Sequence, residues 1–217
     1  VSANVASLGT NVLVLRPERQ AMGPPEGSSK PAQFTLKDAE AVAGLSSVAD
    51  VAPVTRSTQT AVSGNANAST SVTGTSGAYV ALSSYKLTSG RLFTDAEERV
   101  GSGVCILGAT VKTELFGTAD PLDQTIRIKT ISCSVIGVLL AKGAGTFGQD
   151  QDDLILMPIR AVQRRLAGSP DVSSITVGLA KNVSATRGIS DISALLRERR
   201  RIDVGEEDNF SVTDMAQ

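Results

Sequence analysis

The stretch Gly143-Ala144-Gly145-Thr146-Phe147-Gly148-Gln149-Asp150-Gln151-Asp152-Asp153 decides which class of fold this chain can have. Its three glycines have the G-x-G-x-x-G spacing of a dinucleotide-binding turn, and the apolar run 134–140 before them predicts a strand. A pyrophosphate, however, needs the N-terminus of a helix directly after the glycines. Here three aspartates follow, and then the apolar run 154–157, which Pro158 stops and which is too short for that helix. The stretch therefore predicts a strand, a flexible acidic loop and a second strand, and argues against a nucleotide site.

The composition excludes several classes of function. The 217 residues carry a formal net charge of −1, from 21 basic and 22 acidic side chains, so the chain lacks the basic surface that nucleic acid binding requires. The chain contains no histidine, which excludes a Ser-His-Asp triad, a Cys-His pair and any His-ligated metal within it. No apolar run approaches the roughly 18 residues of a membrane span.

The first residues have the spacing of a helix end. Val1, Val5 and Leu8 follow one another at helical intervals, and Gly9 comes where a C-cap glycine is expected. Because the chain begins with valine and not methionine, we expect a fragment or a processed product, with the start of this helix upstream.

The two cysteines, Cys105 and Cys133, both lie in apolar strand-like runs. The simpler interpretation is that they are two small buried hydrophobic side chains. A disulfide between neighbouring strands is the alternative, provided that the compartment is oxidising and the geometry allows it.

A strand–helix–strand pattern occurs at each end of the chain. In the first, a strand at 11–16, with the apolar run 12–15, and a Pro/Gly/Ser-rich loop at 17–31 precede a helix from Leu36 to about Leu45. A strand at 48–62 follows this helix. Thr35 and Asp38 have the spacing of a capping box. We expect this helix to bury Leu36, Ala39, Val42 and Ala43.

The second pattern closes the chain. It consists of a strand at 174–179, a helix at 185–201 and a short strand at 209–213. The apolar face of this helix comprises Ile189, Ile192, Leu195 and Leu196. The basic run 197–201 is followed by acidic residues, so we interpret it as a solvated helix end and not as a nucleic acid or lipid site.

The segment between these patterns alternates short strands and short helices. Strands are predicted at 71–75, 104–107, 125–128, 132–140 and 154–157. Short helices are predicted after the capping box that begins at Thr94, at 109–116 before Gly117, and from Pro158 to Gly168. The fold class is therefore α+β, with an α+β insertion between two βαβ units.

Candidate catalytic and metal sites are incomplete. Ser83 and Lys86 have the S-x-x-K spacing of penicillin-recognising enzymes, but the partner motifs S-D-N and K-T-G are absent. If Asp150 began a calcium loop, the ligand positions would hold Leu154 and Ala161, so at most weak, adventitious Ca²⁺ binding is expected. We predict no catalytic, cofactor or metal site, and a binding or mechanical domain.

The order of ten segments along almost the whole chain resembles a known family. These segments are 7–11, 36–39, 48–53, 87–94, 104–110, 115–117, 120–122, 135–138, 143–153 and 158–159. Each is weak alone, but their order and spacing are similar to those of the periplasmic core domain of MacB-type ABC transporter permeases. The resemblance implies a porter-like subdomain of two βαβ units, at 1–65 and 170–217, and an inserted sabre-like subdomain at 66–169.

The resemblance also implies a function and partners. Such a domain is not an enzyme and is periplasmic: it couples ATP hydrolysis by a cytoplasmic ATP-binding subunit or domain to periplasmic conformational change. Its partners would be a periplasmic membrane fusion (adaptor) protein and possibly an outer-membrane exit duct. The full-length permease would form a homodimer, whereas the isolated domain would be a monomer. Exported substrates would be antibiotics, peptides or related molecules. The alternatives are an extracytoplasmic substrate-binding module and a lipoprotein-transport permease domain.

The acidic loop is the predicted place of partner contact. Phe147 lies among glycines, where it has little to pack on, and an exposed aromatic side chain often anchors an interface. Packing of Phe147 onto its own subdomain is the alternative. We name Phe147, Gln149 and Asp150 as partner-contact residues. The two terminal βαβ units should also bring both chain ends to one side.

Overall fold

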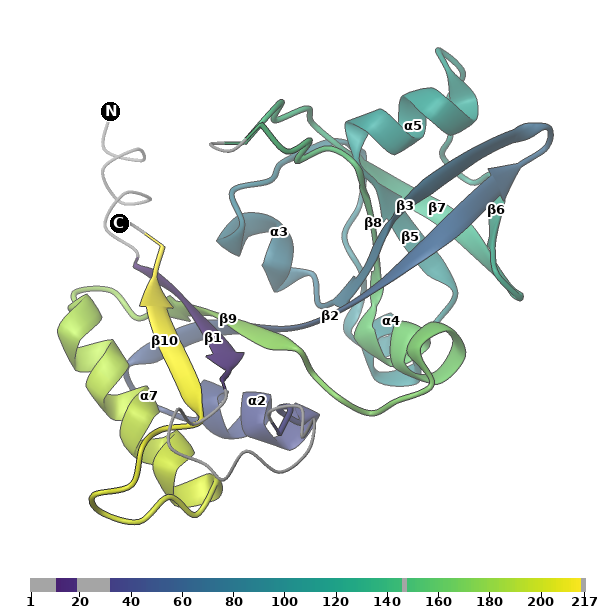
Figure 1. The fold of residues 1–217 in the computed structure, drawn as a ribbon. Helices are drawn as coiled ribbons and strands as arrows, with labels where there is room; N and C mark the ends of the chain where they lie inside the picture. Colours follow the sequence, from purple (N-terminus) through teal and green to yellow (C-terminus); the bar gives the residue numbers. More distant parts are fainter. Residues whose placement is uncertain (1–10, 19–31, 146–147, 216–217) are drawn as a thin grey trace. The chain divides into compact units, whose positions relative to one another are not determined.

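The structure, a computed structural model, describes residues 11–18, 32–145 and 148–215. The predicted helix end at residues 1–9 and most of the predicted loop at 17–31 lie outside these ranges. Two compact units are present: unit 1 comprises Val1–Pro53 and Asp171–Gln217, and unit 2 comprises Val54–Pro170 (Figure 1). Within the described residues, no helix is long and apolar enough to cross a membrane.

Unit 1 contains both predicted strand–helix–strand patterns. The elements are β1 (Val12–Pro17), α2 (Leu36–Ala43), the start of β2 (Val48–Ser63), β9 (Ser174–Leu179), α7 (Ala185–Arg199) and β10 (Phe210–Asp214). The strand order is β10-β1-β9-β2, and β1 is antiparallel to both β10 and β9. The strands β9 and β10 therefore run parallel with β1 between them, as in the split βαβ arrangement of ferredoxin-like folds.

Caps and a salt bridge fix the two helices of unit 1. The predicted capping box of α2 is present: the Thr35 side chain accepts from the Asp38 N–H, and the Asp38 carboxylate accepts from the Thr35 N–H. The other Asp38 oxygen accepts from Arg199 Nε at 2.8 Å, which joins α2 to α7. Ser184 caps the start of α7.

The buried faces of these helices are narrower than predicted. Val42 and Ala39 of α2 are buried, but Leu36 is half-buried and Ala43, the last residue of the helix, is exposed. Along α7, Ile192 and Leu196 are buried, whereas Ile189 and Leu195 are half-buried at the edges of the apolar stripe. The largest fully buried side chain of unit 1 is Phe34, which precedes α2.

Unit 2 is a mixed sheet with short helices. Its strands are the remainder of β2 with β3 (Ala66–Thr75), β4 (Leu87–Gly90), β5 (Val104–Leu107), β6 (Thr125–Ile128), β7 (Ile131–Leu139) and β8 (Leu154–Pro158). Its helices are α3 (Ala78–Leu82), α4 (Asp95–Val100), α5 (Ala109–Phe116), α6 (Ile159–Val162) and the π-helical turn η1 (Gln163–Ala167). The order is β2-β3-β8-β5-β7-β4, with β6 between β2 and β7. The predicted α+β class is confirmed.

Two elements of unit 2 were not predicted. The strand β4 has only four residues and pairs through backbone hydrogen bonds with β7, so its own sequence carries almost no periodicity. The helix α3 has five residues and no side-chain N-cap, and only Tyr79 and Val80 of it are buried. Neither element has the length from which a hydrophobic period can be recognised.

The core of unit 2 contains both cysteines. Cys105 of β5 and Cys133 of β7 are fully buried and form a disulfide, with their Cα atoms 6.0 Å apart. Our simpler interpretation, two unlinked hydrophobic side chains, is therefore replaced by the alternative. The surrounding residues come from six strands and from α5, α6 and η1, and include Val72, Leu107, Val111, Ile155 and Leu166.

Candidate functional site

The glycine-rich stretch connects β7 to β8 and is a loop between two strands, as predicted. Gly143 and Gly148 have φ angles of 85° and 80°, which only glycine adopts readily, and the loop is narrowed by an isolated bridge between Ala144 and Asp150. After the described residues 148–153 the chain enters β8 and not a helix. A dinucleotide site of the usual kind is therefore excluded.

Asp152 ties the two sides of this loop together. Its carboxylate is almost fully buried and accepts hydrogen bonds from the backbone N–H groups of Lys142 and Gly143, each at 2.8 Å. Hydrogen bonds to a charged carboxylate are stronger than hydrogen bonds between neutral groups. The two bonds to Asp152 therefore fix the direction in which the loop leaves β7. The part of the acidic loop that the structure describes is thus anchored at its base, which the expectation of a flexible acidic segment did not include.

Tyr85 and Lys142 make further hydrogen bonds at the two ends of the loop, where it meets the strands. The Tyr85 hydroxyl donates to the Gln151 carbonyl oxygen at 2.7 Å, and Lys142 Nζ donates to the Ser83 carbonyl oxygen at 2.7 Å. The ammonium group also lies 4.0 Å from the centre of the Tyr85 ring. Burial, reinforced by Tyr79 and Asp152, raises the pKa of Tyr85 to about 12, and burial lowers the pKa of Lys142 although Asp152 opposes that shift.

This network gives the segment 83–86 a structural role. The Ser83 group that meets a lysine is its backbone carbonyl, and the lysine is Lys142, not Lys86. The S-x-x-K spacing therefore does not create a nucleophile and base pair here.

The three predicted contact residues lie in different surroundings. Phe147 lies outside the described residues. Gln149 is exposed, and its side chain lies over Gly145, where an added Cβ would be 2.4 Å from Gln149 Nε2. Asp150 uses both carboxylate oxygens within the domain, accepting from Thr110 Oγ1 at 2.6 Å and from the Asp152 N–H at 2.9 Å. Their contact with a partner stays a prediction.

Within the described ranges, no group of three or more His, Cys, Asp or Glu side chains could hold a metal ion. The carboxylates of Asp150 and Asp152 accept hydrogen bonds from protein N–H and O–H donors. One buried carboxylate oxygen of Asp153 has no hydrogen-bond partner among the described residues.

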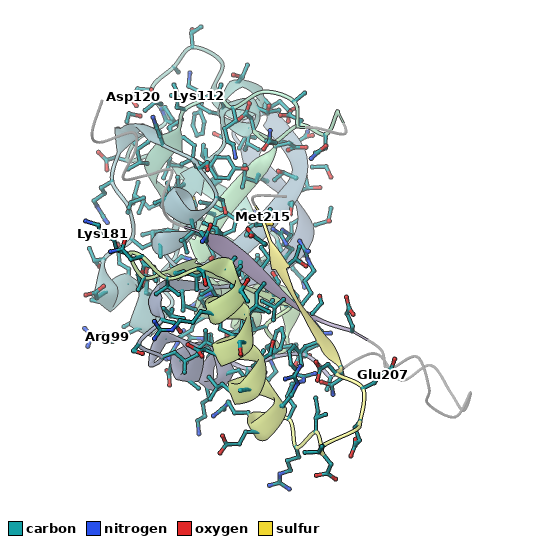
Figure 2. The ribbon with its side chains drawn as sticks, turned by 90° about the vertical axis from the view of Figure 1, so that its left-hand side faces the viewer. Arg99, Lys112, Asp120, Lys181, Glu207 and Met215 are labelled. Carbon is teal, nitrogen blue, oxygen red and sulfur yellow. A yellow bond between two sulfur atoms is a disulfide. The ribbon has the colours of Figure 1, made fainter. Side chains whose placement is uncertain are left out.

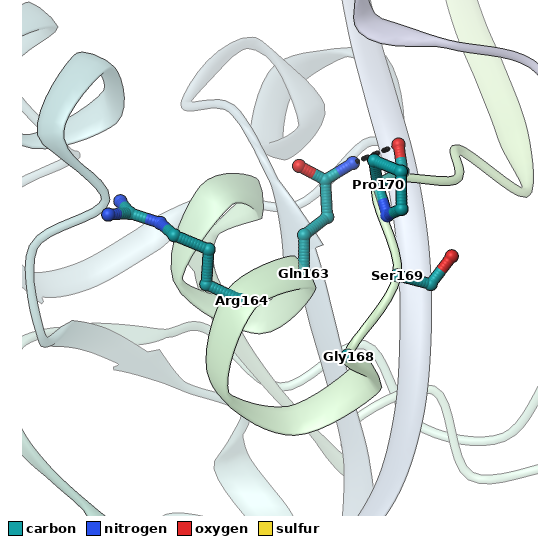
Figure 3. Close-up of a pocket in the computed structure, with 5 residues that line it drawn as sticks. All are labelled: Gln163, Arg164, Gly168, Ser169 and Pro170. Atoms are coloured by element: carbon teal, nitrogen blue, oxygen red, sulfur yellow. Dashed lines mark hydrogen bonds between the residues drawn. The ribbon is translucent and has the colours of Figure 1, made fainter.

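A surface pocket lies elsewhere in unit 2. It has a volume of about 360 Å³ and is lined by Gln163, Arg164, Gly168, Ser169 and Pro170 (Figure 3). The Gln163 side-chain amide donates to the Pro170 carbonyl oxygen across it at 2.9 Å. This volume lies near the lower end of the 300–1,000 Å³ that is typical of binding sites for drug-sized ligands.

Comparison with known proteins decides the family. The model of the MacB-like periplasmic core domain matches residues 1–195. The chain belongs to the family of MacB-like periplasmic core domains. It is therefore the periplasmic core domain of a MacB-like ABC transporter permease, and an extracytoplasmic domain.

Individual relatives agree with this assignment. The chain is 35% identical, over 97% of its length, to the macrolide export ATP-binding/permease protein MacB of Chlorobaculum tepidum, of which it covers 33%. It is 30% identical, over 93% of its length, to the pyoverdine export ATP-binding/permease protein PvdT of Pseudomonas entomophila, of which it covers 30%. This MacB-like domain thus spans about a third of the length of the curated relatives it matches.

A solved structure shares the fold. The periplasmic region of MacB from Actinobacillus actinomycetemcomitans superimposes with a TM-score of 0.79 at 23% identity, covering 97% of this chain and 92% of that one. The predicted family and α+β fold of this MacB-like domain are both confirmed.

Proposed function

We propose that this MacB-like domain relays conformational change in the periplasm during export driven by cytoplasmic ATP hydrolysis. The domain itself carries out no chemistry: an ATP-binding subunit or domain supplies the energy. A homodimeric permease, a membrane fusion adaptor protein and an outer-membrane exit duct complete the transporter, and the isolated domain is a monomer. The proposal is supported by the family match and by relatives whose names state ATP-dependent export.

The proposal gives separate tasks to the two subdomains that the family resemblance implies, whose bounds differ from those of units 1 and 2. Residues 1–65 and 170–217 form the porter-like part, whose two strand–helix–strand patterns connect to the membrane region at the chain ends. Residues 66–169 form the sabre-like part, which carries the 143–153 loop. Exported substrates belong to the antibiotic, peptide and siderophore classes, consistent with the macrolide and pyoverdine exporters among the relatives.

The anchored base of the 143–153 loop carries the proposal of a partner contact. Asp152 holds the start of the loop through two N–H groups, and Tyr85 and Thr110 hold its end through Gln151 and Asp150. A loop whose base is fixed loses less conformational freedom on binding, which favours affinity. Phe147, Gln149 and Asp150 then form the contact with the adaptor.

The contact is tested in the complete transporter with its adaptor. Phe147→Ala should weaken adaptor binding at least tenfold, about 1.4 kcal/mol, because buried aromatic anchors dominate interface energies. Gln149→Ala should have a smaller effect in the same direction. The measurement is adaptor affinity by biolayer interferometry, with export measured in parallel.

Asn65→Ala is a matched control, because Asn65 lies exposed in the turn between β2 and β3 of the same unit. This variant should bind the adaptor as the unchanged protein does. If Phe147→Ala retained both full adaptor affinity and full export, the loop contact would be refuted while the family assignment would stand.

A further inference from the structure

Four arginines lie on three helical elements of unit 2, of which α4 contacts α6 and α6 continues into η1. They are Arg99 of α4, Arg160 of α6, and Arg164 and Arg165 of η1. All four are exposed, and α4 packs against α6 (Figure 1). The Arg99 side chain extends outward from the ribbon (Figure 2). We call these four residues the arginine patch, and they bring four formal positive charges together in a chain whose net charge is −1.

No carboxylate neutralises this patch within the described part of the chain. The salt bridges there join Arg91, Arg187, Arg197 and Arg199 to acidic residues, and none involves the arginine patch. Two of the three acidic residues of α4 are engaged elsewhere: Glu97 pairs with Arg91, and Glu98 accepts from the Gly77 N–H. The third, Asp95, lies one helical turn before Arg99, and none of the four salt bridges involves it. In contrast, the basic run at the end of α7 is largely paired. The arginine patch is therefore the stronger candidate for an external anion.

Two arginines of the patch are held in place by carbonyl groups. Arg160 Nη1 donates to the Arg99 carbonyl oxygen at 3.2 Å, and Arg164 donates to the carbonyl oxygens of Val100 and Arg160. These bonds cap the C-terminal end of α4, where a positive charge is favourable. A guanidinium has five N–H donors, so each retains donors for an outside acceptor. Because the side chains are already ordered, binding costs less rotamer entropy.

An apolar side chain accompanies the charges. Val100, the last residue of α4, is 65% exposed. Its own carbonyl oxygen is one of those that the arginines bind. Interfaces between proteins combine arginines with a few exposed apolar side chains in this way. A membrane surface would instead need several apolar side chains that insert together, and the patch offers one. The chemistry therefore favours an acidic protein partner over anionic lipid.

We propose that the arginine patch is a docking surface for a protein segment that presents several carboxylates beside an apolar side chain. Guanidinium groups recognise carboxylates through paired N–H donors, so Glu and Asp side chains of the partner would each meet one arginine. Val100 receives the apolar side chain. This surface is separate from the 143–153 loop, and its use does not depend on the loop contact.

The test uses the 217-residue chain and a fluorescein-labelled synthetic peptide with four glutamates and two leucines. Fluorescence anisotropy at low salt gives the affinity. Arg99→Gln with Arg165→Gln removes two charges and leaves the two arginines that cap α4 in place. Binding should weaken about fivefold, as expected for two exposed ion pairs of roughly 0.5 kcal/mol each. Val100→Ser should weaken binding about twofold.

The matched control is Arg127→Gln with Lys129→Gln, which removes two exposed charges from β6 and the turn after it. It should leave the affinity unchanged, as should Phe147→Ala, which separates this proposal from the loop contact. The proposal would be overturned if the control variant weakened peptide binding as much as the double variant does. It would also be overturned if the unchanged chain did not bind the peptide, whether or not it bound phosphatidylglycerol vesicles. If the double variant fails to fold, Arg165→Glu alone should still weaken binding.

Discussion

The disulfide between Cys105 and Cys133 should dominate the stability of unit 2. It joins the neighbouring parallel strands β5 and β7, and both cysteines are fully buried. A cross-link stabilises a fold chiefly by restricting its unfolded chain, and the restriction grows with the number of residues that the loop encloses. The perturbation is Cys105→Ala with Cys133→Ala, compared with the unchanged chain in the presence and absence of reductant.

The expected magnitude follows from the sequence separation of 28 residues. The chain-entropy relation gives a loss of about 12 cal/mol/K for a loop of this length, or about 3.6 kcal/mol at 25 °C. With a urea slope of about 2 kcal/mol/M, the midpoint of unfolding should fall by about 1.8 M. Since native domains have total stabilities of roughly 5–15 kcal/mol, such a loss is a large fraction of the whole.

The assay can follow unit 2 alone. The chain has no tryptophan and two tyrosines, Tyr79 and Tyr85, and both belong to unit 2. Intrinsic tyrosine fluorescence during urea unfolding therefore reports that unit. Reductant should lower the midpoint of the unchanged chain by the full amount and leave the double alanine variant unaffected. This pair of comparisons separates the cross-link from the loss of sulfur packing, which occurs in the variant alone.

One result would contradict the reasoning. If the unchanged chain had the same midpoint with and without reductant, the two cysteines would not be cross-linked, or the unfolded chain would already be constrained without the bond. Counting thiols in denaturant without reductant distinguishes these cases, since two free thiols would mean that the bond never formed.

Three further outcomes are expected. Asp152→Asn removes the charge from the acceptor of the Lys142 and Gly143 N–H groups, so hydrogen exchange at these two amides should accelerate about tenfold while unit 2 loses only about 1–2 kcal/mol. In a Tyr79→Phe variant, absorbance at alkaline pH should show Tyr85 ionising above pH 10, because its burial remains, but below about 12, because the charge of Tyr79 no longer opposes its ionisation. In the unchanged chain the folded pKa of Tyr85 lies above its ordinary value of 10, so the stability that Tyr85 contributes is complete below pH 10 and is lost as pH rises through 12. Gly90→Ala places a Cβ 2.1 Å from the Ile136 carbonyl oxygen at a φ of 81°, so it should destabilise unit 2 by about 2 kcal/mol or more in the urea assay.

Much of the fold follows from local patterns. The helix that Thr35 caps and the helix that Gly117 ends both begin and end within two residues of the predicted positions, because the Thr35 side chain marks the start of one and the glycine marks the end of the other. The strand β9 occupies the predicted residues 174–179 because every side chain in it is buried. Register and strand order, in contrast, depend on partners far away in the sequence, so only the structure places β1 between β9 and β10.

The anchoring residues of the loop were harder to foresee. Tyr85 and Thr110 are 58 and 33 residues away from Gly143, the first residue of the loop, and nothing in their neighbourhood marks them as its contacts. A partial signal existed: Tyr85 is one of two tyrosines in the chain, and a buried tyrosine hydroxyl needs a hydrogen-bond partner. The partner itself, the Gln151 carbonyl oxygen, could not be identified without the fold.

The loop also explains why its glycine pattern misleads. In a dinucleotide site, backbone N–H groups at the glycines point toward a phosphate and need a negative charge. In this chain the Gly143 N–H and the neighbouring Lys142 N–H already bind the carboxylate of Asp152. An anion supplied by the chain itself fills the place that a phosphate would take, nine residues after the first glycine. In the sequence, the aspartates show only that no helix directly follows the glycines. The stronger reason that this glycine pattern binds no nucleotide is the hydrogen bonding of Asp152. Its carboxylate already accepts from the Lys142 and Gly143 N–H groups, so these donors are not available to a phosphate.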